Sequence, residues 1–155
     1  MKRTLSIVFA AFFAVPATAQ STATAVEGPL FFAMTEVELS QFKWKKRPVV
    51  VFADSDLDPA FEDQIKKLRA RPEELLTRDV VVIMDTSPEP LSDLRRQLRP
   101  RGFMLVLMSK DGTVNVRKPF PWDVREITRS IDKMPIRKRE IRDAKEQAAR
   151  ARGPF

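Results

Sequence analysis

Apolar residues in this chain form short continuous runs, which alternate with segments of helical spacing. The first clear run is Pro48 to Ala53, rich in β-branched side chains, and the second is Val80 to Met84. Continuous apolar runs of this length are typical of strands buried on both faces, as in parallel sheets covered by helices. A third run extends from Phe103 to Met108. The three runs together predict a central buried sheet.

Three other segments carry apolar residues at the spacing of an amphipathic helix. The first helix is expected to begin at Asp58-Pro59, because aspartate is a favoured N-cap and proline a favoured first helical residue. One face of each helix would be apolar. The residues on these three faces are Phe61, Ile65 and Leu68, then Leu91, Leu94 and Leu98, then Val124, Ile127 and Ile131.

A hairpin is predicted after the third apolar run. Lys110-Asp111-Gly112 contains the Asp-Gly pair that suits a turn with positive φ, and Thr113 to Arg117 alternates as a half-exposed strand. The segment from Pro29 to Phe42 predicts a short strand or helical turn that covers the core. The order is therefore β-α-β-α-β-β-α, with a right-handed parallel crossover between the first strands. This predicts an α/β, thioredoxin-like fold: a four-stranded mixed sheet with helices on both faces.

The N-terminus has the pattern of a signal peptide. Two basic residues precede an apolar run over residues 5–15, which is too short to span a bilayer comfortably. Ala17-Thr18-Ala19 then offers a small-x-small cleavage site. We expect cleavage before Gln20, with residues 1–19 as signal peptide and 20–28 as a flexible leader. An uncleaved anchor is the alternative.

The composition fits one folded domain whose stability comes from its core. The chain has 155 residues, 43% of them hydrophobic and 32% charged, with a net charge of +7. Removal of Lys2 and Arg3 with the signal peptide lowers this charge to +5. There is no cysteine and no histidine. Disulfide bonds and a lipid-modified cysteine are therefore excluded.

The C-terminal region is strongly basic. Residues 137–152 hold seven Lys or Arg and three Asp or Glu. Oppositely charged residues four apart favour a helix. These pairs are Arg139–Asp143, Arg142–Glu146 and Glu146–Arg150. Because almost no apolar face exists here, we expect the helix to fray, and residues 143–155 to form a charged helical or disordered tail. The tail could contact anionic lipid or an acidic partner, whereas nucleic acid is not expected outside the cytoplasm.

Four strings of residues resemble a known family. They are FKWKKRPVVVFA (residues 42–53), RDVV (residues 78–81), the segment from Gly102-Phe103 to Lys110-Asp111-Gly112, and IDKMPIRKRE (residues 131–140). Together they resemble the bacterial family known as domain of unknown function 4174, over about residues 27–142. The resemblance implies a thioredoxin-like fold and an extracytoplasmic setting. It implies no established reaction.

The place where a thiol oxidoreductase keeps its nucleophile contains no sulfur. That place is the junction of the first strand and first helix, where the helix N-terminus stabilises a thiolate. Here it reads Asp54-Ser55-Asp56-Leu57-Asp58. The proline expected just before the third strand, near Phe103 or Met104, is also missing. Ser55 has no histidine base to activate it and is interpreted as a turn or helix-start residue.

The acidic residues after the strands leave a second interpretation open. A strand followed by Asp54-Ser55-Asp56 resembles the first motif of haloacid-dehalogenase-like phosphatases, with Asp85-Thr86-Ser87 after the second strand. No later strand ends in the paired acids that this fold needs, and acids also favour helix N-termini for structural reasons. An intermediate possibility is a loose Mg²⁺ or Ca²⁺ site. Its ligands would be Asp54, Asp56, Asp58 and Asp85.

The sequence as a whole predicts a periplasmic or secreted, non-enzymatic binding module. Its partner would be an unknown protein or another envelope component, and no cofactor is required. The alternative is a carboxylate-based enzyme that depends on a divalent metal. Trp44 and Trp122 are interpreted as core or covering residues, with indole N–H groups near water.

Overall fold

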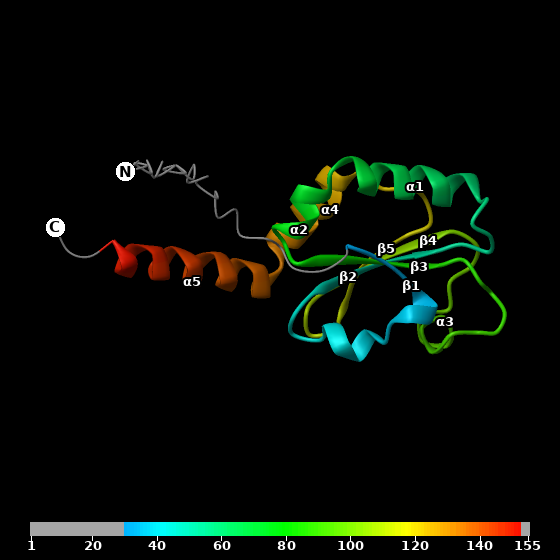
Figure 1. Ribbon diagram of the computed structural model, residues 1–155, viewed down its shortest axis with the longest axis horizontal. Coiled ribbons are helices and arrows are strands. Elements are labelled where there is room, and N and C mark those ends of the chain that lie inside the picture. The colour runs from blue at the N-terminus through cyan, green and yellow to red at the C-terminus, as the bar shows by residue number, and fades with distance from the viewer. Residues whose placement is uncertain (1–29, 153–155) are drawn as a thin grey trace, which may run out of the picture.

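The computed structural model describes residues 30–152. The predicted signal peptide, its cleavage site and the leader 20–28 lie outside the described residues. The fold is built on a five-stranded mixed sheet in the order β1-β3-β2-β4-β5 (Figure 1). The strands are β1 (Phe31–Ala33), β2 (Arg47–Phe52), β3 (Val80–Asp85), β4 (Met104–Met108) and β5 (Val114–Lys118).

The sheet confirms the predicted order from β2 onward and adds one strand. β2 and β3 run parallel, β4 is antiparallel to β2, and β5 is antiparallel to β4. The sheet has five strands where four were predicted. The additional strand is the short edge strand β1, which pairs in parallel with β3. Three residues are too few to show an alternating pattern, so only the broader prediction of a strand or turn was possible there.

Helices cover both faces of the sheet, as predicted (Figure 1). One face carries α1 (Pro59–Ala70), α2 (Pro72–Leu76) and α4 (Val124–Lys133). The other face carries α3 (Asp93–Leu98) and two short 3₁₀ turns. Alternate residues of β2 point into two separate core layers, because successive side chains of a strand face opposite sides. β2 is buried along its whole length for this reason.

The helix starts follow the capping residues. Asp58 caps α1 as predicted, since its Oδ1 accepts hydrogen bonds from the backbone N–H groups of Ala60 and Phe61. Ser92 caps α3 by accepting a hydrogen bond from the N–H of Arg95. The helix therefore begins after Ser92, and the predicted helical residue Leu91 lies before it with 51% of its surface exposed.

The chain ends in a long helix that leaves the body of the molecule. α5 (Pro135–Ala151) has no buried residue and projects away from the sheet (Figure 1). We expected this segment to fray, whereas the structure shows it as helical through Ala151. Of the three predicted pairs, Arg142–Glu146 is present at 4.0 Å. Among residues 30–152, no helix has the length and apolarity needed to cross a bilayer.

Candidate functional site

The acidic segment after β2 lies where the sheet meets the start of α1. Asp58 is committed to the cap of that helix. Ser55 is a turn residue, as interpreted from the sequence, because its Oγ accepts a hydrogen bond from the N–H of Leu57 at 3.1 Å. The carboxylate of Asp54 is 62% exposed. Asp56 is exposed and accepts a hydrogen bond from Ser55 Oγ at 3.4 Å, so the three acids of this segment have different contacts.

Asp85, at the end of β3, forms a buried ion pair with Arg95 of α3. Their side chains are 3% and 4% exposed, and Arg95 Nε donates to Asp85 Oδ1 at 2.8 Å. The second carboxylate oxygen accepts a hydrogen bond from Ser92 Oγ at 2.8 Å. Both oxygens of this buried carboxylate are thus satisfied by protein donors, as a buried charge requires. We call Asp85, Ser92 and Arg95 the Arg95 cluster.

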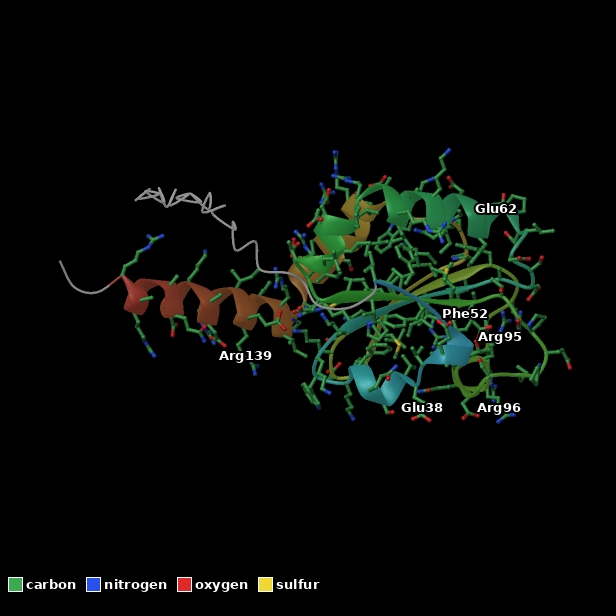
Figure 2. All side chains as sticks on the ribbon, viewed as in Figure 1. Glu38, Phe52, Glu62, Arg95, Arg96 and Arg139 are labelled. Carbon is green, nitrogen blue, oxygen red and sulfur yellow. The ribbon has the colours of Figure 1, made fainter. Side chains whose placement is uncertain are left out.

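Arg95 also ties the ends of β2 and β3 together. Its Nη2 donates to the backbone carbonyls of Ala53 and Asp85. The guanidinium lies 5.4 Å from the centre of the Phe52 ring, and Figure 2 shows the two side chains next to each other at this end of the sheet. Arg95 Nη1 is 3.7 Å from Asp54 Oδ1. One guanidinium therefore contacts both strand ends and two of the predicted site acids.

The four acids predicted as metal ligands are used in different ways. Asp54 and Asp85 are brought together by Arg95, Asp58 belongs to the helix cap, and Asp56 is exposed beside Ser55. Among residues 30–152, no three side chains of the His, Cys, Asp or Glu type form a group that could hold a metal ion. A guanidinium between two carboxylates also opposes a cation there. The metal site stays a prediction, and the donor set described here fits it poorly.

Arg95 could not be identified as a site residue from the sequence alone. Its only signal is its place in the helix that follows Asp85, next to the core residue Leu94. A single arginine in a segment that also contains Arg96 and Arg99 cannot be distinguished from its neighbours by pattern. Only the fold shows that one of them is buried.

A second ionic cluster lies at the opposite end of the sheet, where α5 begins. Arg47, the first residue of β2, is fully buried, and its Nη2 donates to Glu140 Oε2 of α5 at 2.8 Å. Its Nη1 donates to the carbonyl of Arg78 at 2.8 Å. Lys110 Nζ lies 2.8 Å from carboxylate oxygens of both Asp79 and Glu140. The first turns of α5 are therefore bound to the sheet.

Two more arginines extend this cluster, which we call the Arg47 network. Arg78 donates to both carboxylate oxygens of Asp132, at 2.9 and 2.8 Å. Arg137 lies 3.3 Å from Glu140 and also donates to the carbonyl of Thr77. The network consists of Arg47, Arg78, Asp79, Lys110, Asp132, Arg137 and Glu140.

Two carboxyl groups of the network have lowered pKa values. The hydrogen bond from Arg78 is the main cause for Asp132, whose pKa lies below its usual range despite partial burial. Burial is the largest influence on Glu140 and would raise its pKa. Hydrogen bonds from Lys110 and Arg47 outweigh it, so the pKa of Glu140 is also lowered. Both groups are held in their charged form by the folded structure.

Trp44 is not the covering residue that we expected. It lies in the turn before β2, with 65% of its surface exposed and a φ of 65°. In this conformation the Trp44 N–H donates a hydrogen bond to the carbonyl of Lys110 at 2.6 Å. Trp122, in contrast, packs against the core as predicted.

A family model described as "Domain of unknown function (DUF4174)" matches residues 38–140. The chain belongs to this family. The match includes strands β2 to β5, both ionic clusters and the turn that contains Trp44. It extends from the 3₁₀ turn before β2 to Glu140 in α5. The shared region of this DUF4174 chain thus ends at the residue that pairs with Arg47.

Solved structures show what fold this DUF4174 chain has. The reduced 2-Cys peroxiredoxin of Plasmodium vivax is 17% identical, with a TM-score of 0.52, and the match covers 62% of this chain and 81% of that one. Thioredoxin peroxidase I of Plasmodium yoelii is 19% identical, with a TM-score of 0.47 and coverages of 62% and 76%. The match to the peroxiredoxin of Plasmodium vivax shows that the fold is thioredoxin-like. The peroxiredoxin's name refers to two cysteines, and this chain has none.

Proposed function

We propose that this DUF4174 chain is an exported, non-enzymatic binding module that keeps the thioredoxin-like fold without its redox chemistry. The observation that carries the proposal is the Arg95 cluster. In this fold the start of α1 is where a thiolate would be stabilised by the helix N-terminus. Here Asp58 occupies that N-terminus, and the adjacent Asp85 is neutralised by Arg95 and Ser92.

The arrangement supports binding because its charged groups are already paired with one another. A catalytic carboxylate needs a free oxygen for a proton, a metal or a substrate. Asp85 is not open to such a partner, because its side chain is 3% exposed and both its oxygens already accept protein hydrogen bonds. Asp54 is exposed, but its nearest described ion-pair partner is the Arg95 guanidinium. The remaining role of these residues is to hold the strand ends in place.

Metal-dependent melting distinguishes this proposal from the alternative, a carboxylate enzyme. The melting temperature is measured with and without millimolar Mg²⁺ or Ca²⁺, for the wild-type protein and for the Asp54→Asn/Asp56→Asn variant. We expect no metal-dependent shift in either protein. A shift in the wild type that disappears in the variant would support the enzyme and contradict the binding module.

Binding itself is tested by capture from the native envelope. The exported protein is cross-linked in place, and the recovered material is analysed for both proteins and lipids. We expect a specific envelope component with the wild type, and the same component with the Asp54→Asn/Asp56→Asn variant. If no envelope component of either kind is recovered, the proposal is wrong.

Export is supported by the signal-peptide pattern of residues 1–19. N-terminal sequencing of the protein from the extracytoplasmic fraction is expected to begin at Gln20. Changing the last residue of the cleavage site, Ala19→Arg, should leave an unprocessed chain. Wild-type protein that stays in the cytoplasm at full length would contradict export.

A further inference from the structure

The end of the sheet opposite the Arg95 cluster carries an exposed tryptophan between lysines. The turn consists of Lys43, Trp44, Lys45 and Lys46, directly before the buried strand β2. We call residues 43–46 the Trp44 turn. Lys43 and Lys45 are exposed and Lys46 is half-buried. None of the three lies within 4.0 Å of a carboxylate oxygen in the described part of the chain.

The turn presents its tryptophan in a fixed way. The N–H groups of Lys45 and Lys46 both donate to the carbonyl of Phe42, at 3.0 and 2.8 Å, and the N–H of Trp44 donates to Lys110. Phe42 is itself buried in the core. A φ of 65° is unfavourable for a residue with a Cβ, and the exposed indole makes little contact that offsets this cost. A large apolar side chain in this position points to a surface that it contacts.

Further positive charge is held at the same end of the molecule. Glu140 of α5 contacts both Arg47, which follows the Trp44 turn, and Lys110, whose carbonyl accepts the Trp44 N–H. These contacts fix the base of α5 beside the turn. Residues 137–152 carry seven basic and three acidic residues, a net charge of +4. Figure 2 shows Arg139 on the part of α5 that projects from the body.

A hollow lies beside the turn and has both polar and apolar walls. It has a volume of about 240 Å³ and is lined by Lys43, Lys46 and Lys110, with the buried side chains of Phe42 and Met108 among its apolar residues. Asp111 also lines it, but its carboxylate accepts the N–H of Thr113. Lys110 is already paired with Asp79 and Glu140. The free charge at the hollow therefore comes from Lys43 and Lys46.

We propose that this end of the molecule binds the surface of an anionic phospholipid bilayer. The inference rests on the proposed function and names the partner of the binding module. The Trp44 indole would lie at the headgroup level, where amphipathic rings are favoured, and Lys43, Lys45 and Lys46 would contact lipid phosphates. A flat lipid surface fits better than an acidic protein, because α5 has exposed charge along its projecting half and no apolar face to dock.

The test is binding to vesicles. All elements of the fold begin after Leu30, so the chain from Gln20 onward keeps them and lacks the apolar N-terminal run. The chain has two tryptophans and no tyrosine, so the Trp122→Phe variant reports on Trp44 alone. Vesicles of equal phosphatidylglycerol and phosphatidylcholine are compared with pure phosphatidylcholine. We expect sedimentation with the first only, and a blue shift of Trp44 emission.

The variant Lys43→Gln/Lys45→Gln/Lys46→Gln is expected to lower the vesicle partition coefficient at least tenfold. Each lysine close to an anionic membrane surface raises the partition coefficient by about fivefold. Trp44→Gly should also weaken binding and tests the indole separately. The matched control is Lys66→Gln/Arg125→Gln/Arg129→Gln, which removes three exposed charges from α1 and α4. We expect the control to bind like the wild type.

Three outcomes would overturn the inference. The first is equal vesicle binding by the turn variants and the charge-matched control. That result would show that binding depends on the net charge of the protein and not on the Trp44 turn. The second is an equal blue shift with inorganic phosphate alone, which would indicate a free-anion site. The third is no binding to anionic vesicles. If envelope capture still recovers a protein partner in that case, the lipid inference fails and the binding module stands.

Discussion

Arg95 and Arg47 are two buried arginines that connect strand ends to helices. Arg95 contacts the carbonyls after β2 and in β3, and Arg47 contacts the carbonyl of Arg78 just before β3. A guanidinium has five N–H donors, so one side chain can satisfy a carboxylate and several carbonyls at once. Burial of such a charge is tolerated only while these acceptors remain. The two ends of the β2–β3 pair are therefore sensitive to single substitutions.

The first prediction concerns Arg95. Replacement by an apolar residue, Arg95→Met, would leave the buried Asp85 carboxylate without its countercharge, which typically costs about 3–5 kcal/mol. The double variant Asp85→Asn/Arg95→Met should recover part of this loss, because it removes the uncompensated charge. The free energies of unfolding are measured by urea denaturation at pH 7. A double variant no more stable than Arg95→Met would contradict this account.

Trp44 gives a prediction of the opposite kind. Glycine adopts the positive φ of this position without backbone strain. The indole is mostly exposed, so its loss removes little packing. We expect Trp44→Gly to change the free energy of unfolding by less than about 1 kcal/mol in either direction. Gly112→Ala is the comparison, because its φ is 90° and an added Cβ meets nothing within 4 Å. That variant should lose about 1 kcal/mol from backbone strain alone. A loss above about 2 kcal/mol in Trp44→Gly would assign the indole a structural role.

At the level of elements, we expect the stability of the junction between α5 and the sheet to depend on pH. The folded state lowers the pKa values of Asp132 and Glu140, so it favours their charged forms. Their contribution to stability is full above the pKa values of the unfolded chain, about 4, and is lost as the pH falls through the lower values of the folded chain.

The corresponding experiment is an acid series of urea denaturations between pH 7 and pH 2. We expect the free energy of unfolding to fall below about pH 4.5. Glu140→Gln should lower stability at pH 7 by about 1–3 kcal/mol, since the fully buried Arg47 loses a charged acceptor. The same variant should then lose less on acidification than the wild type. If the unfolding free energies of the two proteins fall in parallel with pH, the ionisation of Glu140 does not contribute to the stability of the fold.

Elements whose pattern extends over five or more residues could be predicted from the sequence. The apolar runs of β2, β3 and β4 and the faces of α1 and α4 are long enough to distinguish a strand from a helix. β1 has three residues, and its pairing with β3 is a tertiary contact that local pattern does not contain. α5 was expected to fray because its own side chains bury nothing. Its first turns are instead fixed by Arg47 and Lys110.

The site was predictable only as a location. The sequence placed acids after β2 and β3, and the structure brings Asp54 and Asp85 to one guanidinium. The identity of that guanidinium depends on which side of α3 faces the sheet. The backbone of Trp44 forms a hydrogen bond to Lys110, which is far away in the sequence. Both features arise from contacts between segments that are distant in the sequence. The local pattern of apolar residues carries no information about such contacts.

At the scale of the whole molecule, the two ends of the sheet differ in how their charges are paired. The Arg95 cluster lies at the end where a redox-active member of this fold would hold its reactive group. The charges of the cluster are paired with one another. The Trp44 turn and α5 keep unpaired lysines and projecting charge at the other end. Figure 1 shows α5 leaving the body at that end. Under the proposed function, the paired clusters stabilise the fold, whereas the Trp44 turn and the projecting half of α5 are open to contact a surface.

This separation predicts different results for two truncations. Deletion of residues 143–155 keeps Glu140 and removes only exposed parts of α5, so the free energy of unfolding should change by less than about 0.5 kcal/mol. Deletion of residues 135–155 also removes Glu140, the carboxylate that accepts a hydrogen bond from the buried Arg47, which should cost about 3–5 kcal/mol. Urea denaturation compares both with the full domain. Equal losses of unfolding free energy from the two deletions would contradict this prediction. They would mean that the projecting half of α5 stabilises the fold, although no residue of α5 is buried.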